Sequence, residues 1–174
     1  MSKTASKLTF LAIVASALLL SATTLEAQTK TTAHYKEVHY EVSSDGSLLG
    51  DPADGHYLGV WVRKGLTIFE TGEVAAYSAF GYIDITKGNG MISGHDETIF
   101  ADGSSWSTKF EGQFSVGAKG LWVIPHKGEF IKGTGRYEGI QGTLTYTSKQ
   151  INSAKDFAGL AETEGTAIYT LPSK

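Results

Sequence analysis

Glycine is concentrated in one short stretch of the chain, and its spacing there limits the folds that the sequence can adopt. The stretch GTGRYEGIQGTLTYT, residues 133–147, carries glycines at 133, 135, 139 and 142 around a single Tyr137. Glycine this dense beside an alternating strand pattern is typical of tight corners, bulges and closely approaching backbones. It predicts a small closed antiparallel barrel, which encloses either its own side chains or one small ligand.

The rest of the chain also alternates between turns and strands. Turn signals such as Asp45-Gly46, Asp54-Gly55 and Asp102-Gly103 recur at short intervals. Between them lie β-branched and aromatic segments with a period of two, which indicates a meander of hairpins. We expect strands near 34–43, 57–63, 66–71, 74–86, 91–100, 104–116, 121–131, 140–149 and 162–171. Some adjacent pieces form one bent strand, so the prediction is an all-β barrel of about eight antiparallel strands, with a short helical or irregular connection near 153–160.

Two of these strands have clearly different faces. In 104–116, the apolar residues of one parity are Trp106, Phe110, Phe114 and Val116. In 140–149, the corresponding set is Ile140, Leu144 and Tyr146. The opposite parities carry Lys, Glu, Gln, Ser and Thr, so we expect the apolar sets to face a largely aromatic interior. Such an interior either packs on itself or holds a hydrophobic ligand.

The first 27 residues have the layout of a secretory signal peptide. Lys3 and Lys7 flank the start of an apolar run over 8–20, and a more polar segment leads to a cleavage position after Ala27. The run is too short for a bilayer, which needs about 20 residues. We therefore expect residues 1–27 to be removed and residues 28–174 to form one secreted or periplasmic domain, and a retained N-terminal anchor is the alternative.

Composition excludes several classes of function. The net charge is −3, and no basic run stands out, so the electrostatic footprint of nucleic-acid binding is lacking. The chain has no cysteine. Disulfides, thiolate metal sites, cysteine nucleophiles and a lipidated cysteine anchor are thereby excluded.

Residues 133–139 (GTGRYEG), 167–172 (AIYTLP) and 40–43 (YEVS) resemble three segments of the superfamily of allene oxide cyclase-like barrels, to which the dirigent proteins also belong. Residues 133–139, GTGRYEG, are similar to that family's glycine-rich corner G-x-G-x-[FY]-x-G, and Gly142 follows at the expected place. Residues 167–172, AIYTLP, resemble its closing strand. Residues 40–43, YEVS, resemble a Tyr-Glu-Ile-Asn stretch on the first strand of plant allene oxide cyclases.

The resemblance implies a pocket for hydrophobic organic molecules that works without a metal or an organic cofactor. In the plant cyclases, the glutamate of the first strand helps to steer cyclisation of an unstable fatty-acid epoxide, and the resemblance gives that role to Glu41. This chain departs from them at Ser43, where they have asparagine, and it lacks their cavity cysteine. Dirigent proteins guide radical coupling or eliminate water in a similar pocket. By analogy, the family also implies a homo-oligomer, a trimer.

The first strand has one polar face and one apolar face. The polar face carries Glu37, His39, Glu41 and Ser43. The apolar face carries Val38, Tyr40 and Val42. The ordinary inside/outside rule sends the apolar face inward and Glu41 to water. If the polar face lines a cavity instead, desolvation would raise the pKa of Glu41, and His39 beside it could shuttle a proton.

Several other residues are candidates for a catalytic or substrate-binding site. On the functional interpretation, Glu41, His39 and Ser43 are catalytic. The substrate-binding candidates are Tyr40, Glu70, Trp61, Trp106 and Tyr137. The tryptophans are either core residues or stacking surfaces for a planar ligand, and Glu70 is either an acid inside the barrel or an exposed strand end. His95 and Glu97 share a second mixed face, either solvent-facing or directed inside.

Metal and nucleotide sites have little support in the sequence. His34 and His39 are an odd number of residues apart, so a regular strand places them on opposite faces. No His-x-His pair, Gly-x-Ser-x-Gly elbow, P-loop or dinucleotide fingerprint is present. We predict neither a metal nor a cofactor.

Three hypotheses for function remain. The first is a cofactor-independent cyclase, isomerase or lyase acting on a small hydrophobic molecule, with Glu41 moving a proton or stabilising positive charge. The second is a lipocalin-like carrier that binds an apolar compound without changing it. The third is a structural barrel whose interior is filled by its own side chains.

Overall fold

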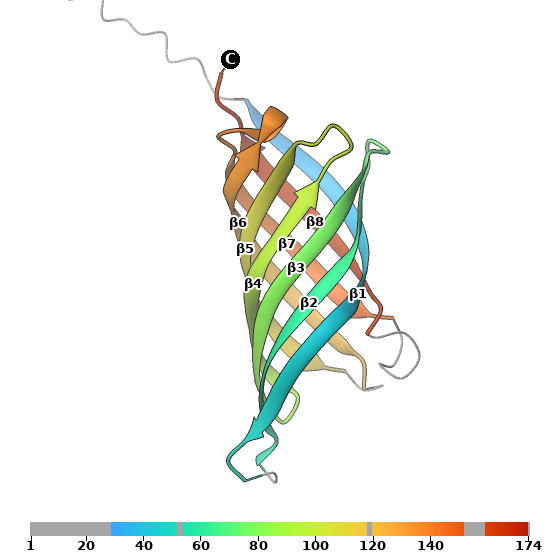
Figure 1. Ribbon diagram of the computed structural model, residues 1–174, viewed down its shortest axis with the longest axis vertical. Helices are drawn as coiled ribbons and strands as arrows, with labels where there is room; N and C mark the ends of the chain where they lie inside the picture. The colour runs from blue at the N-terminus through green and yellow to red at the C-terminus, as the bar shows by residue number, and fades with distance from the viewer. Residues whose placement is uncertain (1–28, 52–53, 118–119, 152–158, 174) are drawn as a thin grey trace, which may run out of the picture.

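The computed structural model describes residues 29–51, 54–117, 120–151 and 159–173, which form a closed barrel of eight antiparallel strands (Figure 1). The strands are β1 (Lys30–Leu49), β2 (His56–Phe69), β3 (Val74–Thr86), β4 (Asn89–Ile99), β5 (Ser105–Val116), β6 (Trp122–Thr134), β7 (Gln141–Gln150) and β8 (Ala161–Thr170). Each strand pairs with its neighbours in sequence, and β8 closes the barrel on β1. The all-β barrel predicted from the sequence is thereby confirmed. No helix in the described ranges has the length and apolar character needed to cross a bilayer.

The segments near 57–63 and 66–71 form one strand, β2, in line with the expectation that some adjacent pieces are joined. One boundary differs from expectation. The turn expected at Asp45-Gly46 lies inside β1, where Gly46 pairs with Gly59 of β2. A side chain on Gly46 would overlap the ring of Tyr57, so glycine here makes room for a neighbour and does not reverse the chain. Residues 1–27, and most of 153–160, lie outside the described residues, and the signal peptide stays a prediction.

The faces predicted for β5 and β7 are confirmed. Trp106, Phe110 and Phe114 are buried in β5, and Leu144 and Tyr146 are buried in β7. Val116 is the exception, because it ends β5 and is 45% exposed.

The ordinary inside/outside rule is wrong for β1. Glu37 and His39 are buried, whereas Val38, Tyr40 and Val42 are close to half exposed. The polar side chains can face inward because the flanking strands supply partners there. Thr67 of β2 donates a hydrogen bond to Glu37, and Thr163 of β8 lies 3.1 Å from the His39 ring nitrogen.

One end of the barrel is closed by a cluster of aromatic rings. Trp106 lies at its centre, with ring centroids 4.8 Å from Tyr137 and 5.0 Å from Phe100. Phe69, Phe130 and Tyr169 complete the cluster. Arg136 covers it from outside, with its guanidinium carbon 4.5 Å from the centroid of Phe100. We call this group the aromatic plug.

The glycine-rich corner places Tyr137 in the aromatic plug. A short 3-10 helix, η2 (Gly135–Tyr137), turns the chain between β6 and β7. Gly135 has a φ of 59°, a conformation that other residues rarely adopt. A Cβ on Gly133 would overlap the backbone carbonyl of Tyr137. The corner is therefore tight because glycine lets the backbone of β6 touch the turn that follows it.

Replacing Gly133 with alanine should destabilise the barrel by more than about 2 kcal/mol, because the added methyl group meets backbone that cannot move aside. Thermal unfolding of the two proteins measures the difference. Gly117→Ala is the control, since a Cβ there would have its nearest neighbour, Leu121 O, at 3.4 Å. Equal melting temperatures for Gly133→Ala and Gly117→Ala would contradict this account of the corner.

Candidate functional site

A cavity of about 260 Å³ lies inside the barrel. It lies towards the end opposite the aromatic plug, where β6 and β8 begin. Its apolar wall includes Trp61, Ile83, Ile92, Phe110, Phe114, Trp122 and Ile124, and Tyr57, Val60 and Tyr77 also line it. Its polar groups come mainly from β1, β2, β6 and β7: His39, Glu41, Ser44, Arg63, His126, Tyr146 and Ser148. The side chain of Glu41 keeps a third of its surface exposed, which places it at the mouth of the cavity.

Arg63 is held by contacts from several elements. Its Nε donates a hydrogen bond of 2.8 Å to Nδ1 of His39, and its Nη2 donates to the carbonyl oxygen of Gly159. Its Nη1 lies 3.8 Å from the Glu41 carboxylate, and its guanidinium carbon is 5.3 Å from the ring centroid of Trp122. Arginine stays charged in proteins, so this arrangement fixes one positive charge in the cavity wall.

His39 orients Arg63 and is itself held in one tautomer. Its Nδ1 accepts the hydrogen bond from Arg63, so in the neutral ring the proton lies on Nε2, which donates to Thr163. The Thr163 hydroxyl is also 2.8 Å from that of Ser148. Burial, together with the positive charge of Arg63, lowers the pKa of His39 to about 3. The imidazole is therefore neutral at physiological pH, with both nitrogens occupied.

A β-bulge determines which residues accompany Glu41. The pairing of β1 with β2 shifts between Glu41 and Ser43. Because of this shift, Ser43 is exposed and does not line the cavity, whereas Ser44 does. The Ser44 hydroxyl donates a hydrogen bond of 2.7 Å to Glu41. Of the three residues predicted to be catalytic, Glu41 and His39 line the cavity and Ser43 does not, and Ser44 lies beside Glu41 instead.

The predicted substrate-binding residues are spread over different parts of the molecule. Trp61 forms part of the cavity wall. Tyr40 is 49% exposed on the outer surface, because it alternates with the inward His39 and Glu41. Trp106 and Tyr137 belong to the aromatic plug, outside the cavity lining.

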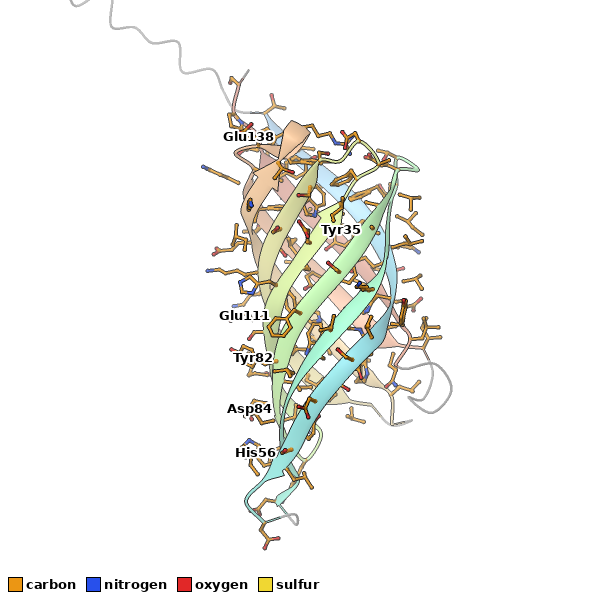
Figure 2. All side chains as sticks on the ribbon, in the orientation of Figure 1. Tyr35, His56, Tyr82, Asp84, Glu111 and Glu138 are labelled. Carbon is orange, nitrogen blue, oxygen red and sulfur yellow. The ribbon has the colours of Figure 1, made fainter. Side chains whose placement is uncertain are left out.

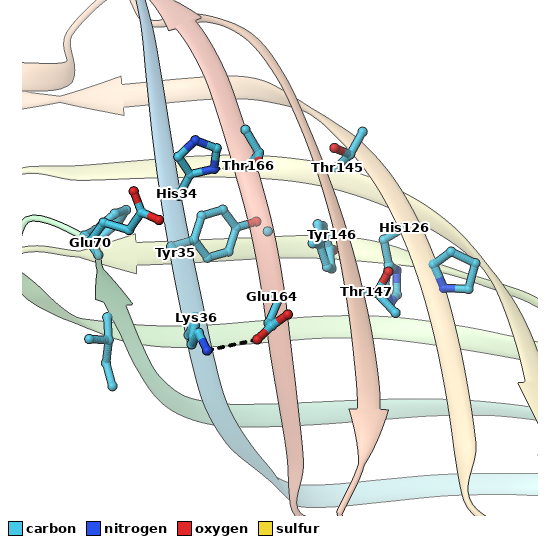
Figure 3. Close-up of a pocket in the computed structure, with 14 residues that line it drawn as sticks. His34, Tyr35, Lys36, Glu70, His126, Thr145, Tyr146, Thr147, Glu164 and Thr166 are labelled. Carbon is cyan, nitrogen blue, oxygen red and sulfur yellow. Dashed lines mark hydrogen bonds and ion pairs between the residues drawn. The ribbon is translucent and has the colours of Figure 1, made fainter.

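Glu70 lies at the exposed end of β2, beside a groove on the outer surface of the barrel (Figure 3). The groove crosses β1, β8, β7 and β6, and an ion pair of 2.9 Å joins Lys36 to Glu164 in it. Both of these side chains are more than 60% exposed, and ion pairs between exposed side chains contribute little to the stability of the fold. His95 is exposed and Glu97 is partly buried, so the mixed face of β4 does not supply the cavity with a buried acid.

Glu37 and Asp96 form a second set of buried polar side chains, which was not identified from the sequence. Glu37 and Asp96 are both buried between the aromatic plug and the cavity, and each accepts a threonine hydrogen bond: Thr67 to Glu37 at 3.2 Å, and Thr108 to Asp96 at 2.7 Å. Burial raises the pKa of Glu37, and the negative charge of Asp96 raises it further. Burial raises the pKa of Asp96 to about 7. Tyr146 lines both this region and the cavity, so it separates the acids from the open space.

Two buried nitrogens have no hydrogen-bond partner among the described residues: Nε1 of Trp61 and Nδ1 of His126. Burial lowers the pKa of His126 to about 3, so its ring is neutral. The signal that could have found Arg63 and His126 is parity, since each shares a strand face with an inward apolar residue, Trp61 and Ile124 respectively. Among the described residues, no three His, Asp or Glu side chains are grouped as a metal site would require.

No family model and no curated protein matches the chain. Two solved structures that match are those of the pterocarpan synthase dirigent proteins GePTS1 and PsPTS1. GePTS1 is 14% identical, covers 87% of this chain and 96% of its own, and gives a TM-score of 0.46. PsPTS1 is 13% identical, covers 85% and 99%, and gives a TM-score of 0.46.

Replacing Asp96 with asparagine should stabilise the protein above neutral pH. The pKa of Asp96 is about 7 in the folded chain, against an ordinary value of 3.8. The folded state therefore binds more protons between these values, and stability falls as pH rises from about 4 to about 7. Asp96→Asn lacks this loss, so its melting temperature at pH 8 should exceed that of the wild type by roughly 5–10 °C.

The comparison of the two proteins at pH 4 is the internal control. The lowered pKa values of His39 and His126 destabilise the fold on acidification, but they do so equally in both chains and cancel in the difference. A melting-temperature difference that is the same at pH 4 and pH 8 would show that Asp96 ionises as easily in the fold as in the unfolded chain.

Proposed function

We propose that the barrel binds a small, largely apolar organic molecule in its lumen. There it catalyses a cyclisation, an isomerisation or an elimination without a cofactor, as a cyclase, isomerase or lyase does. The observation that supports this proposal is the cavity itself. An apolar and aromatic wall faces one fixed guanidinium and one carboxylate, Arg63 and Glu41. Ligand sites commonly combine a mostly apolar lining with a few placed polar groups.

The size of the cavity limits the ligand. A volume of about 260 Å³ equals that of about nine waters at ~30 Å³ each. A ligand of on the order of ten non-hydrogen atoms fits such a space, which corresponds to a single substituted ring. Trp61 and Phe110, with centroids 6.0 Å apart and planes at 27°, offer a flat surface on which a ring can pack.

The charged groups have distinct roles in this proposal. Arg63 binds an oxygen of the ligand and stabilises negative charge that develops on it. Glu41 accepts a proton or stabilises positive charge, and Ser44 orients its carboxylate. His39 is a positioning residue, since both of its nitrogens are engaged and its ring is neutral. The proton shuttle expected for a Glu/His pair thus has less support than a role for His39 in holding Arg63.

A carrier that binds the same ligand without changing it is the second candidate. This candidate is favoured because the polar groups of the cavity already form hydrogen bonds and an ion pair with one another. Glu41 contacts Ser44 and Arg63, and His39 contacts Arg63 and Thr163. The third hypothesis, a filled structural barrel, has less support because the cavity is present.

Filling the cavity should abolish binding of small ring compounds. Ile92 lines the cavity and is 6% exposed, so Ile92→Trp places an indole in the space. Calorimetric titration with monocyclic phenols and benzoates should show binding to the wild type and at least tenfold weaker binding to Ile92→Trp. Met91→Trp is the matched control, because Met91 precedes Ile92 and is 46% exposed on the outside. A panel that binds neither the wild type nor the control would contradict the proposed ligand class.

The carboxylate is tested separately with a ligand recovered by denaturation and solvent extraction from Glu41→Gln protein made in the native host, because a substrate accumulates where conversion is slow. Glu41→Gln should bind this compound within about threefold of the wild type but convert it at least about 100-fold more slowly, as expected for a lost proton-transfer group. Conversion is followed by mass spectrometry. Glu129→Gln, an exposed glutamate of β6, is the control and should convert normally. If Glu41→Gln converts the compound as fast as the wild type does, Glu41 takes no part in the mechanism. If the wild type binds the compound but leaves it unchanged, the carrier is favoured.

A further inference from the structure

Two histidines line the cavity, and they differ in their hydrogen bonds. Both nitrogens of His39 are engaged, one by Arg63 and the other by Thr163. Among the residues that the structure describes, neither nitrogen of His126 has a hydrogen-bond partner. Its Nδ1 is fully enclosed, whereas its Nε2 keeps some accessible surface. A polar ring inside a barrel without a partner is uncommon, so the free nitrogens of His126 require an explanation.

Aromatic packing holds the His126 ring in place. His126 lies opposite Tyr146 on the neighbouring strands β6 and β7 (Figure 3), and the two rings are stacked, with centroids 4.4 Å apart and planes at 16°. The ring of Phe110 stands at 85° to the imidazole, with centroids 5.4 Å apart. The orientation of the imidazole is therefore fixed without a polar contact, and its nitrogens are left for another group.

A glycine in the opposite strand determines which nitrogen of His126 meets the cavity. Gly112 of β5 pairs with His126. Its neighbour Glu111 points away from the barrel (Figure 2), so position 112 faces the lumen. A Cβ on Gly112 would lie 2.6 Å from Nδ1 of His126. Glycine thus lets the imidazole lie against the barrel wall with Nδ1 enclosed, and Nε2 is the nitrogen left to the cavity.

The enclosed nitrogen also indicates where the imidazole proton lies. A neutral imidazole has one N–H donor and one acceptor nitrogen. An enclosed N–H without an acceptor is rarer in proteins than an enclosed acceptor without a donor. Nδ1 of His126 has no partner, so the proton belongs on Nε2. The nitrogen that meets the cavity is therefore a hydrogen-bond donor.

His126 and Arg63 come from opposite walls of the cavity. Arg63 lies on β2 and His126 on β6, and three strands lie between β2 and β6 in each direction around the closed barrel. Both side chains line the cavity. The interior of an eight-stranded barrel can hold one small ligand, so a ligand between these walls has a guanidinium on one side and an imidazole N–H on the other.

We propose that Nε2 of His126 donates a hydrogen bond to an oxygen of the ligand, on the side of the ligand that faces away from Arg63. This role rests on the proposed function, because it needs a ligand in the cavity. It narrows the ligand to a ring compound with an oxygen acceptor on each of two opposite sides. During the reaction, the neutral imidazole stabilises negative charge that develops on this oxygen and keeps its own proton.

Two ketones that differ by one oxygen test this role. 4-Hydroxyacetophenone has an oxygen on each of two opposite sides of its ring, whereas acetophenone has one on a single side. Calorimetric titration should show that the wild-type chain binds 4-hydroxyacetophenone at least about tenfold more tightly, because acetophenone leaves a buried donor unpaired. His126→Leu should bind the two ketones within about threefold of each other, since it has no donor. Thermal unfolding checks that each variant is folded.

Two amide variants distinguish a hydrogen bond from packing. The amide of His126→Gln reaches the position of Nε2 and should keep most of the preference for 4-hydroxyacetophenone. The shorter amide of His126→Asn reaches only the position of Nδ1 and should lose it. A residue that acts through packing alone would not separate the two amides in this way. His95→Leu is the matched control, because His95 is exposed on β4, and it should keep the wild-type preference.

Each other outcome overturns the proposed role of His126. If the wild type binds both ketones equally, or if His126→Leu keeps the preference, the donor does not act on the ligand, and the proposed function stands without it. If the wild type binds neither ketone, the ligand class of the proposed function fails as well. Nitrogen-15 NMR of the ligand-free chain gives an independent readout. It should find the His126 proton on Nε2, and a proton on Nδ1 would contradict the role whatever the ligand is.

Discussion

The hydrogen bond from Arg63 to His39 joins two neighbouring strands inside the barrel, and the arrangement of the site depends on it. Burying an arginine and a histidine away from water is costly unless both find partners. Here Arg63 contacts His39, Gly159 and Glu41, and His39 in turn forms a hydrogen bond with Thr163. The network thus ties β1, β2 and β8 together at one level of the lumen. It also sends the apolar side of β1 outward, which creates the exposed outer face.

The interior changes in character along the barrel axis. The aromatic plug closes one end, the buried acids Glu37 and Asp96 follow, and the cavity with Arg63 and Glu41 lies beyond them. In the part of the lumen formed by the described residues, the cavity is where free volume and fixed charge occur together. The proposed chemistry is therefore confined to this end of the lumen.

The fold was more predictable than the site, for reasons that particular residues illustrate. Turn glycines and the alternation of Trp106 with Lys109 and Glu111 in sequence determine strands and faces locally, so the barrel followed from the sequence. Which face of β1 points into the barrel could not be predicted in this way, because it depends on Arg63 and Thr163, which reach His39 from other strands. The bulge that places Ser44 and not Ser43 beside the cavity arises from the pairing of β1 with β2, which the sequence of β1 alone does not reveal. Glu37 and Asp96 were missed because burial of an acid depends on distant threonines.

The direct test of this account is the protonation state of His39, measured by nitrogen-15 NMR of the histidine rings between pH 4 and pH 8. The account predicts a neutral ring with the proton on Nε2 throughout this range, because burial lowers the pKa of His39 to about 3 and Arg63 occupies Nδ1. A ring that gains a proton near its ordinary pKa of 6.5 would contradict the account, since the polar side of β1 would then face water.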